Sequence, residues 1–297
     1  MQKKIKILLT GSSGQLGACI FEHLAKFKRK NKILIFKNRI NFLKINRISL
    51  ELNKIKPNII INCAAYTDVE RAEREKRLCN KINNLAVVKI ANFCKVNNVY
   101  LIHFSTDFVF NGTSKIIGKF TKPDPLNYYG LTKYKAEQNI FKSKCKHLIL
   151  RISWIYSKYK NNFPSKIIKQ IKSLKNISIF GKEIGSPTSV RVVSEFVLKI
   201  IDNYIKHNEI TGVYNLACRN CASRYIVAKF ILNYFKILNR KYSKIKIYNF
   251  QNKENSKIKR PKISIFCLKK IKKKFYKKIP TWRIEMKDFL KNNYNNL

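Results

Sequence analysis

The chain has 297 residues, with 63 Lys and Arg against 16 Asp and Glu, and its formal net charge is +47. This length allows one α/β core, or a nucleotide-binding domain with a smaller second lobe. A run of about 18 apolar residues, which a membrane-spanning helix requires, is absent. The apolar stretch behind Met1 is also too short for a secretion signal. We therefore expect a cytoplasmic protein that does not contact a membrane.

The positive charge has two interpretations. A strongly basic chain can bind nucleic acid by neutralising phosphates, usually through basic residues gathered on one face. Here the Lys residues are spread along the whole sequence and come with many Ile and Asn residues. Adenine- and thymine-rich codons produce this joint bias. We interpret the charge as compositional drift and predict no specific nucleic acid partner.

Eight cysteines are scattered through the chain, and we expect reduced thiols. Cys218 and Cys221 have the spacing of a metal clip, but a structural zinc site also needs a second pair or two histidines at similar spacing. The four histidines are isolated in the sequence. We therefore predict no metal site.

The N-terminal segment predicts a dinucleotide site. Residues 4–10 are rich in β-branched residues and leucine and predict a buried strand, and the apolar spacing after residue 17 predicts a helix. Glycines between a strand and a helix allow a tight turn, a close approach of the backbone to a pyrophosphate, and close packing of the helix. The expected cofactor-binding residues of this turn are Gly11, Gly14, Gln15, Leu16 and Gly17.

The second predicted strand, residues 33–36, ends at Lys37. A carboxylate usually stands at this point and binds the hydroxyls of the adenosine ribose. Lys37, with Asn38 and Arg39 after it, favours a 2′-phosphate instead, so we predict NADPH as the cofactor. NADH is the alternative cofactor, because compositional drift also favours a lysine at this position.

Two further strands are predicted to end at the same edge of the sheet. Residues 58–63 lead into Ala64-Ala65-Tyr66-Thr67-Asp68, and residues 99–104 lead into Ser105-Thr106-Asp107. Small residues at the carboxyl end of a parallel strand leave room for a ligand. We expect a short helix over 50–56 before the first of these strands. Between the two strands we expect a long helix from Asp68, its N-cap, to about Val96.

Residues 108–128 are rich in Gly, Pro and Asn and predict a surface loop over the site. The next helix, to about residue 142, carries Tyr129 and Lys133 one turn apart on one face. Such a pair suits acid–base chemistry, because a nearby ammonium favours the phenolate. A solvated lysine beside an exposed tyrosine would give the same pattern. A fifth strand, residues 147–152, then leads to Ser153-Trp154.

From residue 161 the order of elements changes. Helices are predicted over 163–174, 190–205 and 223–238, with a short strand at 213–216 and a last helix after Trp282. We predict a Rossmann-type, doubly wound parallel α/β sheet with a smaller C-terminal substrate-binding lobe. The expected domains are residues 1–155, the NAD(P)-binding domain, and 156–297, mainly the substrate lobe, with some elements returning to the sheet.

Several motifs stand in the same order and spacing as in one known family. They are Thr10-Gly11-Ser12-Ser13-Gly14-Gln15-Leu16-Gly17, Asn62-Cys63-Ala64-Ala65-Tyr66-Thr67, Ser105-Thr106-Asp107-Phe108-Val109-Phe110, Tyr129-Gly130-Leu131-Thr132-Lys133, Arg151-Ile152-Ser153-Trp154, Gly185-Ser186-Pro187-Thr188 and Arg260-Pro261. Over nearly its whole length, the chain resembles the dTDP-4-dehydrorhamnose reductases, which are short-chain dehydrogenases. The resemblance implies NAD(P)H-dependent reduction of a dTDP-linked 4-keto-6-deoxy sugar to dTDP-L-rhamnose, the last step of dTDP-rhamnose biosynthesis.

The resemblance also implies a role for each matching residue. Tyr129 would protonate the C4 oxygen, Thr106 would hydrogen-bond the same oxygen, and Lys133 would hold the nicotinamide ribose and lower the pKa of the phenol. The implied substrate-binding residues are Thr106, Asp107, Trp154 and Arg260, the last as a fork for the pyrophosphate. The implied cofactor-binding residues include Ala65, Tyr66, Thr67, Tyr129 and Lys133.

The chain departs from the family pattern at a few positions. Lys37 and Lys44 stand where aspartates are frequent, and Cys19 and Arg191 stand where some relatives bind magnesium through glutamates at a dimer interface. We therefore predict no metal-bridged dimer and leave a monomer or a homodimer open. Two alternatives to the implied activity are a non-catalytic nucleotide-binding regulatory subunit and a reductase of a different nucleotide-linked 4-keto sugar.

Overall fold

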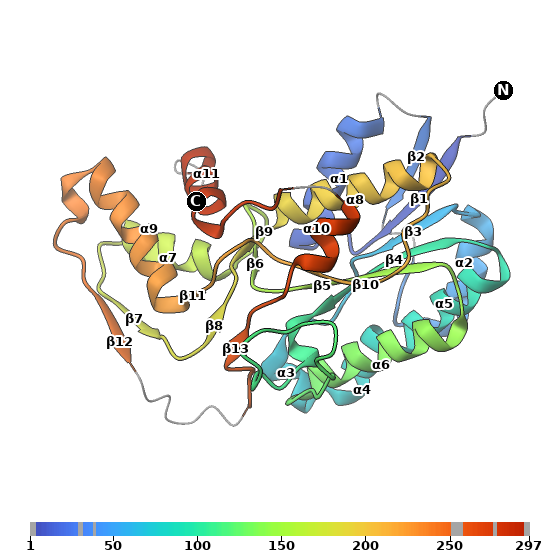
Figure 1. The fold of residues 1–297 in the computed structure, drawn as a ribbon, viewed down its shortest axis with the longest axis horizontal. Coiled ribbons are helices and arrows are strands. Elements are labelled where there is room, and N and C mark those ends of the chain that lie inside the picture. The colour runs from blue at the N-terminus through green and yellow to red at the C-terminus, as the bar shows by residue number, and fades with distance from the viewer. Residues whose placement is uncertain (1–3, 29–31, 38–39, 251–257, 276–277, 294–297) are drawn as a thin grey trace.

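The computed structural model of the chain describes residues 4–28, 32–37, 40–250, 258–275 and 278–293. A six-stranded parallel sheet forms its centre (Figure 1). The strands lie in the order β10 (Gly212–Leu216), β5 (His147–Ile152), β4 (Tyr100–Thr106), β3 (Ile59–Asn62), β1 (Ile5–Thr10) and β2 (Ile33–Lys37). The order of the strands reverses between β1 and β3, where doubly wound sheets bind ligands. The predicted fold class is confirmed.

Helices cover both faces of the sheet because its strands are apolar on both sides. Ile7 and Leu9 belong to one hydrophobic cluster and Leu8 to the other, as the two-residue period of a strand requires. The first cluster lies under α1 (Gln15–Lys28) and α8 (Val190–Ile205). The second lies under α2 (Ile48–Ile55), α5 (Ala86–Val96) and α6 (Tyr128–Ser143).

The C-terminal lobe lies beside the carboxyl ends of the strands (Figure 1). Its helices are α7 (Phe163–Lys172), α9 (Arg224–Leu238) and α11 (Trp282–Asn293). It has two pairs of strands, β6 (Ile155–Tyr156) with β9 (Thr188–Ser189), and β7 (Ile177–Phe180) with β12 (Ile247–Phe250). A three-stranded sheet has β8 (Ile184–Gly185) between β11 (Ala222–Ser223) and β13 (Ile263–Ser264). The chain also returns to the main sheet, through α8, β10 and α10 (Lys269–Phe275).

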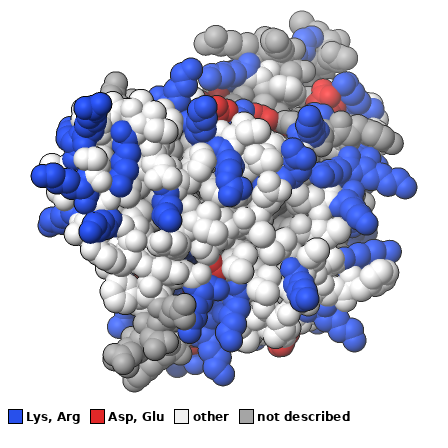
Figure 2. Space-filling view, turned by 60° about the vertical axis from the view of Figure 1, so that its left-hand side comes forward, with Lys and Arg blue, Asp and Glu red and all other residues white. Residues whose placement is uncertain are grey.

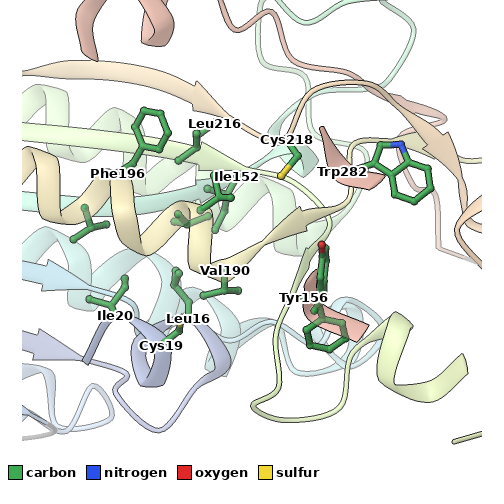
Figure 3. Close-up of a cluster of buried hydrophobic side chains, with 14 of the residues drawn as sticks. Leu16, Cys19, Ile20, Ile152, Tyr156, Val190, Phe196, Leu216, Cys218 and Trp282 are labelled. Carbon is green, nitrogen blue, oxygen red and sulfur yellow. The ribbon is translucent and has the colours of Figure 1, made fainter. Parts of the chain in front are cut away.

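One hydrophobic core runs from the sheet into the lobe. Figure 3 shows Leu16 and Ile20 of α1 close to Val190 of α8, and the same cluster reaches Tyr156 and Trp282 at the base of the lobe. Both of these large aromatic side chains are almost fully buried. Burial of this much apolar surface fixes the lobe against the sheet. The division of the chain at residue 155 stays a prediction.

The long helix predicted from Asp68 to Val96 is wrong in detail. Asp68 is the expected N-cap and accepts hydrogen bonds from the backbone N–H groups of Glu70 and Arg71. The helix then breaks at Glu75, giving α3 (Val69–Arg74) and α4 (Lys76–Asn80), and continues as a π-helical turn, η2 (Lys81–Leu85), into α5. The Glu75 carboxylate accepts from Arg71 and from the distant Tyr66, a contact that apolar periodicity does not reveal.

The loop predicted over 108–128 is not wholly a surface loop. Its start forms a single 3-10 turn, η3 (Asp107–Val109), and turns of the same kind and length occur at η1 (Ile45–Arg47) and η4 (Arg240–Tyr242). Val109, Phe110 and Ile117 are buried in a third small core together with Phe266. The loop is therefore held in place by the C-terminal part of the chain.

Figure 2 shows Lys and Arg side chains spread around one face of the molecule, with few Asp or Glu side chains between them. Within the part of the chain that the structure describes, no helix is both long and apolar enough to span a bilayer. None of the eight cysteines forms a disulfide.

Candidate active site

The glycine turn after β1 requires glycine at two positions. Gly11 has a φ of +65°, and a Cβ there would lie 2.5 Å from the backbone nitrogen of Ala64. A Cβ on Gly17 would lie 2.2 Å from the carbonyl oxygen of Gly11. Both distances are far below van der Waals contact, so the turn, the exit of β3 and the start of α1 pack without side chains between them. The amino end of α1 thereby lies at the switch point of the sheet.

β4 places two polar residues at the neighbouring position. Thr106, its last residue, accepts a hydrogen bond from the Phe108 N–H at 3.2 Å and donates to the Asp107 carboxylate at 3.1 Å. Ser153, which follows β5, donates to the other oxygen of Asp107 at 3.2 Å. Burial raises the pKa of Asp107 above its usual value, although these hydroxyls partly offset the effect.

Helix α6 lies close against the exit of β4. Its N-cap, Asn127, accepts from the Gly130 N–H at 2.9 Å, and a Cβ on Gly130 would lie 2.1 Å from the Phe108 carbonyl oxygen. This approach places Tyr129 edge-on to the Phe108 ring, with ring centroids 5.7 Å apart. The Thr106 hydroxyl is close enough to the phenol to act on its pKa. The predicted acid and the predicted hydroxyl therefore meet.

The predicted effect of Lys133 on the phenol is not what the structure has. Burial raises the pKa of Tyr129 above its usual value, and the Thr106 hydroxyl lowers it only in part. The Lys133 Nζ instead donates to the Phe104 carbonyl oxygen at 2.6 Å and lies 3.3 Å from His103 Nε2. Burial lowers the pKa of Lys133 to about 8. Tyr129 is thus a protonated phenol at neutral pH, as a proton donor must be.

These groups line one cavity of about 420 Å³ at the carboxyl edge of the sheet. Many of the sequence-predicted site residues line it: Gly14, Gln15, Leu16, Gly17, Ala65, Thr67, Thr106, Asp107, Tyr129, Lys133 and Trp154. The glycine turn thus shares one cavity with Thr106, Tyr129 and Lys133, although these residues come from three separate segments of the chain.

Four predicted residues do not line this cavity. Gly11 shapes the turn behind it. The Tyr66 hydroxyl donates to Glu75 at 2.7 Å, so its side chain joins the α3–α4 break. Lys37 lies exposed with its ammonium 4.0 Å from the centre of the Phe21 ring, and its neighbours Asn38 and Arg39 fall outside the described residues.

Arg260 is the fourth of these residues. Its Nη2 donates to the carboxylate of Glu70 at 3.1 Å, and its Nε is buried without a partner among the described residues. The contact with Glu70 does not involve the cavity around Tyr129. Its assignment to the pyrophosphate therefore stays a prediction.

The sequence analysis missed Arg224, which lines this cavity and an adjoining one of about 220 Å³. Its guanidinium lies 4.8 Å from the Trp154 ring centre and pairs with Glu183 at 3.0 Å. Trp154 itself has a φ of +47°, and a Cβ on Gly185 would lie 2.4 Å from its indole ring. Gly185 thus leaves room for the indole of Trp154, but no pattern in the sequence indicated Arg224.

The residues present fit a dinucleotide cofactor. The backbone at Gly14 and Gly17 faces the cavity without side chains, so a pyrophosphate can approach the helix N-terminus. Ser105 also lines the cavity, and its hydroxyl is buried without a hydrogen-bond partner among the described residues. Buried polar atoms usually have a partner, so this hydroxyl is available to a ligand.

Comparison with known proteins agrees with this geometry. The model of the RmlD substrate binding domain family matches residues 5–295 of the chain. The chain belongs to the RmlD substrate binding domain family. This RmlD-family chain is 30% identical over 215 residues to the dTDP-4-dehydrorhamnose reductase of Salmonella typhimurium, covering 71% of this chain and 72% of that one. It is 27% identical to the Escherichia coli K12 enzyme of the same name over 297 residues, which cover 96% and 97% of the two chains.

A solved structure resembles this RmlD-family chain over almost its full length. It is the dTDP-4-dehydrorhamnose reductase of Bacillus anthracis in complex with NADP. The TM-score is 0.87 at 30% sequence identity, and the match covers 98% of this chain and 100% of the other.

Proposed function

We propose that this protein is an NADPH-dependent dTDP-4-dehydrorhamnose reductase, which reduces dTDP-4-dehydro-6-deoxy-L-mannose to dTDP-L-rhamnose. The observation that carries the proposal is the meeting of Thr106, Tyr129 and Lys133 with the glycine turn in one cavity. The names of the relatives in this family, and the NADP in one of the solved structures, support it.

The chain's own residues would perform three tasks. The Tyr129 phenol, whose raised pKa keeps it protonated, donates its proton to the C4 oxygen of the sugar. Thr106 donates a hydrogen bond to the same oxygen, where negative charge develops. Lys133, when protonated, is a positive charge within the same cavity. The bound NADPH supplies the hydride that reduces the ketone carbon, so that hydride and proton together convert the C4 ketone into an alcohol.

The remaining polar residues of the cavity suit binding of the sugar nucleotide. Asp107 is buried and hydrogen-bonded to Thr106 and Ser153, and Trp154 lines the same cavity. Arg224 is a second cation for the diphosphate, in addition to Arg260, because its guanidinium lies in the wall of the cavity. Gly14, Gln15, Leu16, Gly17, Ala65 and Thr67 would hold the cofactor.

A direct assay tests the proposal. Purified protein is mixed with NADPH and dTDP-4-keto-6-deoxy-L-mannose, and the loss of nicotinamide absorbance is followed. The expected result is consumption of NADPH that depends on the sugar nucleotide, with dTDP-L-rhamnose as the product. A parallel series with NADH measures the cofactor preference that Lys37 leaves open. If the protein bound NADPH but consumed none with any 4-keto sugar nucleotide, it would be the non-catalytic subunit. If it turned over only a different nucleotide-linked 4-keto sugar, it would be a reductase of that sugar.

A further inference from the structure

A row of buried polar side chains crosses the sheet below the active-site helix. Thr10 of β1 stands opposite Asn62 of β3, and Asn62 stands opposite His103 of β4. The row ends at Lys133, which reaches down from α6. All four residues are at most 3% exposed. Buried polar groups must satisfy one another, so the direction of each hydrogen bond in this row is constrained.

The direction is fixed at Asn62. The Ala64 backbone N–H, which can only donate, lies 3.2 Å from Asn62 Oδ1, and the Thr10 hydroxyl donates to the same oxygen at 2.7 Å. The amide nitrogen of Asn62 therefore points the other way, 3.1 Å from His103 Nδ1. An amide NH₂ only donates, so His103 Nδ1 must accept. A neutral imidazole with an acceptor at Nδ1 carries its proton on Nε2.

That Nε2–H faces the amine of Lys133 at 3.3 Å. A lysine ammonium has three donors and no acceptor, so it cannot accept this hydrogen, whereas a neutral amine has a lone pair that can. The amine keeps an N–H for the Phe104 carbonyl oxygen at 2.6 Å. An imidazolium at His103 would not resolve the conflict, because it would aim a second N–H at the Asn62 amide.

We propose that His103 is a positioning residue whose Nε2–H favours the neutral amine of Lys133 over the ammonium, and so sets the pH above which the reductase loses activity. The inference about activity rests on the proposed function and takes the ammonium form of Lys133 as the active one. To become charged, Lys133 has to give up its contact with His103. Protonation is therefore harder than in water, and the fraction of active enzyme falls as the pH rises.

Other groups around Lys133 and His103 bear on the same equilibrium. Burial lowers the pKa of Lys133 to about 8, while Glu137 on α6 and the thiols of Cys63 and Cys79 act in the opposite direction. Burial, Lys133 and His147 of β5 all lower the pKa of His103, which keeps its ring neutral. A loss of activity above about pH 8 is the consequence for the wild-type enzyme.

The tautomer of His103 is the direct test and needs no substrate. In ¹⁵N-labelled protein, long-range nitrogen–hydrogen correlations distinguish the two ring nitrogens of each histidine. The expected pattern for His103 is a protonated Nε2 and an unprotonated Nδ1 at neutral pH. A protonated Nδ1 would overturn the proposal, whatever the activity of the protein. Replacing His23, His147 and His207 one at a time assigns the His103 signal even if variants at position 103 do not fold.

Two variants test the effect on Lys133. In Asn62→Asp the carboxylate accepts where the amide donated, so His103 should move its proton to Nδ1 and accept from the ammonium at Nε2. In His103→Gln the amide oxygen can accept from the ammonium. In both, the alkaline limb of the kcat/KM profile should move upward by about one pH unit, because a hydrogen bond now favours the charged lysine.

His147→Gln is the matched control for these profiles. His147 is also a buried histidine, but its Nδ1 hydrogen-bonds the Cys145 carbonyl oxygen at 2.8 Å and does not face Lys133. The alkaline limb of the kcat/KM profile of His147→Gln should stay within a few tenths of a pH unit of the wild type. If Asn62→Asp and His103→Gln only lowered kcat/KM equally at every pH, the two residues would be structural and the proposal would be wrong. Inactivity of the wild type would refute the proposed function and leave the tautomer test intact.

Discussion

Replacement of Tyr129 by Phe isolates the proton-donating step. The Phe ring keeps the edge-on contact with Phe108, whose centroid is 5.7 Å away, and removes only the hydroxyl. Thr106 keeps its hydrogen bonds with Asp107 and with the Phe108 N–H. The variant should therefore fold normally, with an unfolding temperature within a few degrees of the wild type.

The expected loss follows from the chemistry of the step. General acid catalysis typically contributes about 10²- to 10⁴-fold. Thr106 still donates to the C4 oxygen in the variant, so part of the stabilisation of that oxygen remains. We expect kcat to fall by about 10²-fold or more, with the Kd for NADPH changed less than about threefold because the cofactor contacts of the turn are intact. Stopped-flow reduction and a fluorescence titration measure the two quantities.

Tyr128→Phe is the matched control. Tyr128 is the adjacent residue of α6, does not line the cavity, and lies 5.6 Å from the ammonium of Lys76. Its variant should retain nearly full turnover. If Tyr129→Phe were as active as Tyr128→Phe, Tyr129 would not be the acid, and another donor in the cavity would have to be sought.

Three further predictions concern the turn, the sheet and the surface. Gly17→Ala places a Cβ 2.2 Å from the Gly11 carbonyl oxygen, so it should destabilise the fold by about 1–3 kcal/mol and weaken NADPH binding. Gly118→Ala, which meets nothing within 4 Å, should leave both unchanged, and equal effects of the two would refute the packing argument. Arg151→Met leaves the Glu137 carboxylate, whose side chain is 1% exposed, without its ion-pair partner, and denaturant unfolding should show a loss of about 3 kcal/mol. Finally, the net charge of +47 should cause weak binding to duplex DNA of any sequence, and filter binding should no longer detect this binding at high salt. Binding to one DNA sequence that resists high salt would instead mean a specific nucleic acid site.

Local signals predicted the parts of the site that a single segment determines. The strand at 99–104 and the helix from Tyr129 follow from apolar patterning and from the one-turn spacing of Tyr129 and Lys133. Parallel strands end at one edge of the sheet, so the sequence predicts that Thr106 and the glycine turn lie together. The structure extends that strand to Thr106 and begins the helix at Tyr128, small differences that leave the site unchanged.

Long-range contacts were beyond these signals. Glu75 ends α3 while accepting a hydrogen bond from Tyr66, and this contact takes the Tyr66 side chain away from the cavity. Arg224 reaches the cavity because α9 packs in the lobe against Trp154, 70 residues earlier in the chain. Neither residue belongs to a pattern with a fixed spacing, so sequence reasoning could not place them.

The sequence by itself determined the doubly wound sheet and the glycine turn and indicated Tyr129 as the candidate acid, because each depends on periodicity or on the chemistry of residues close in the chain. Only the tertiary structure decided the protonation of that site. Burial, and the row from Thr10 through His103 to Lys133, set which groups carry protons, and these effects depend on neighbours from four separate segments.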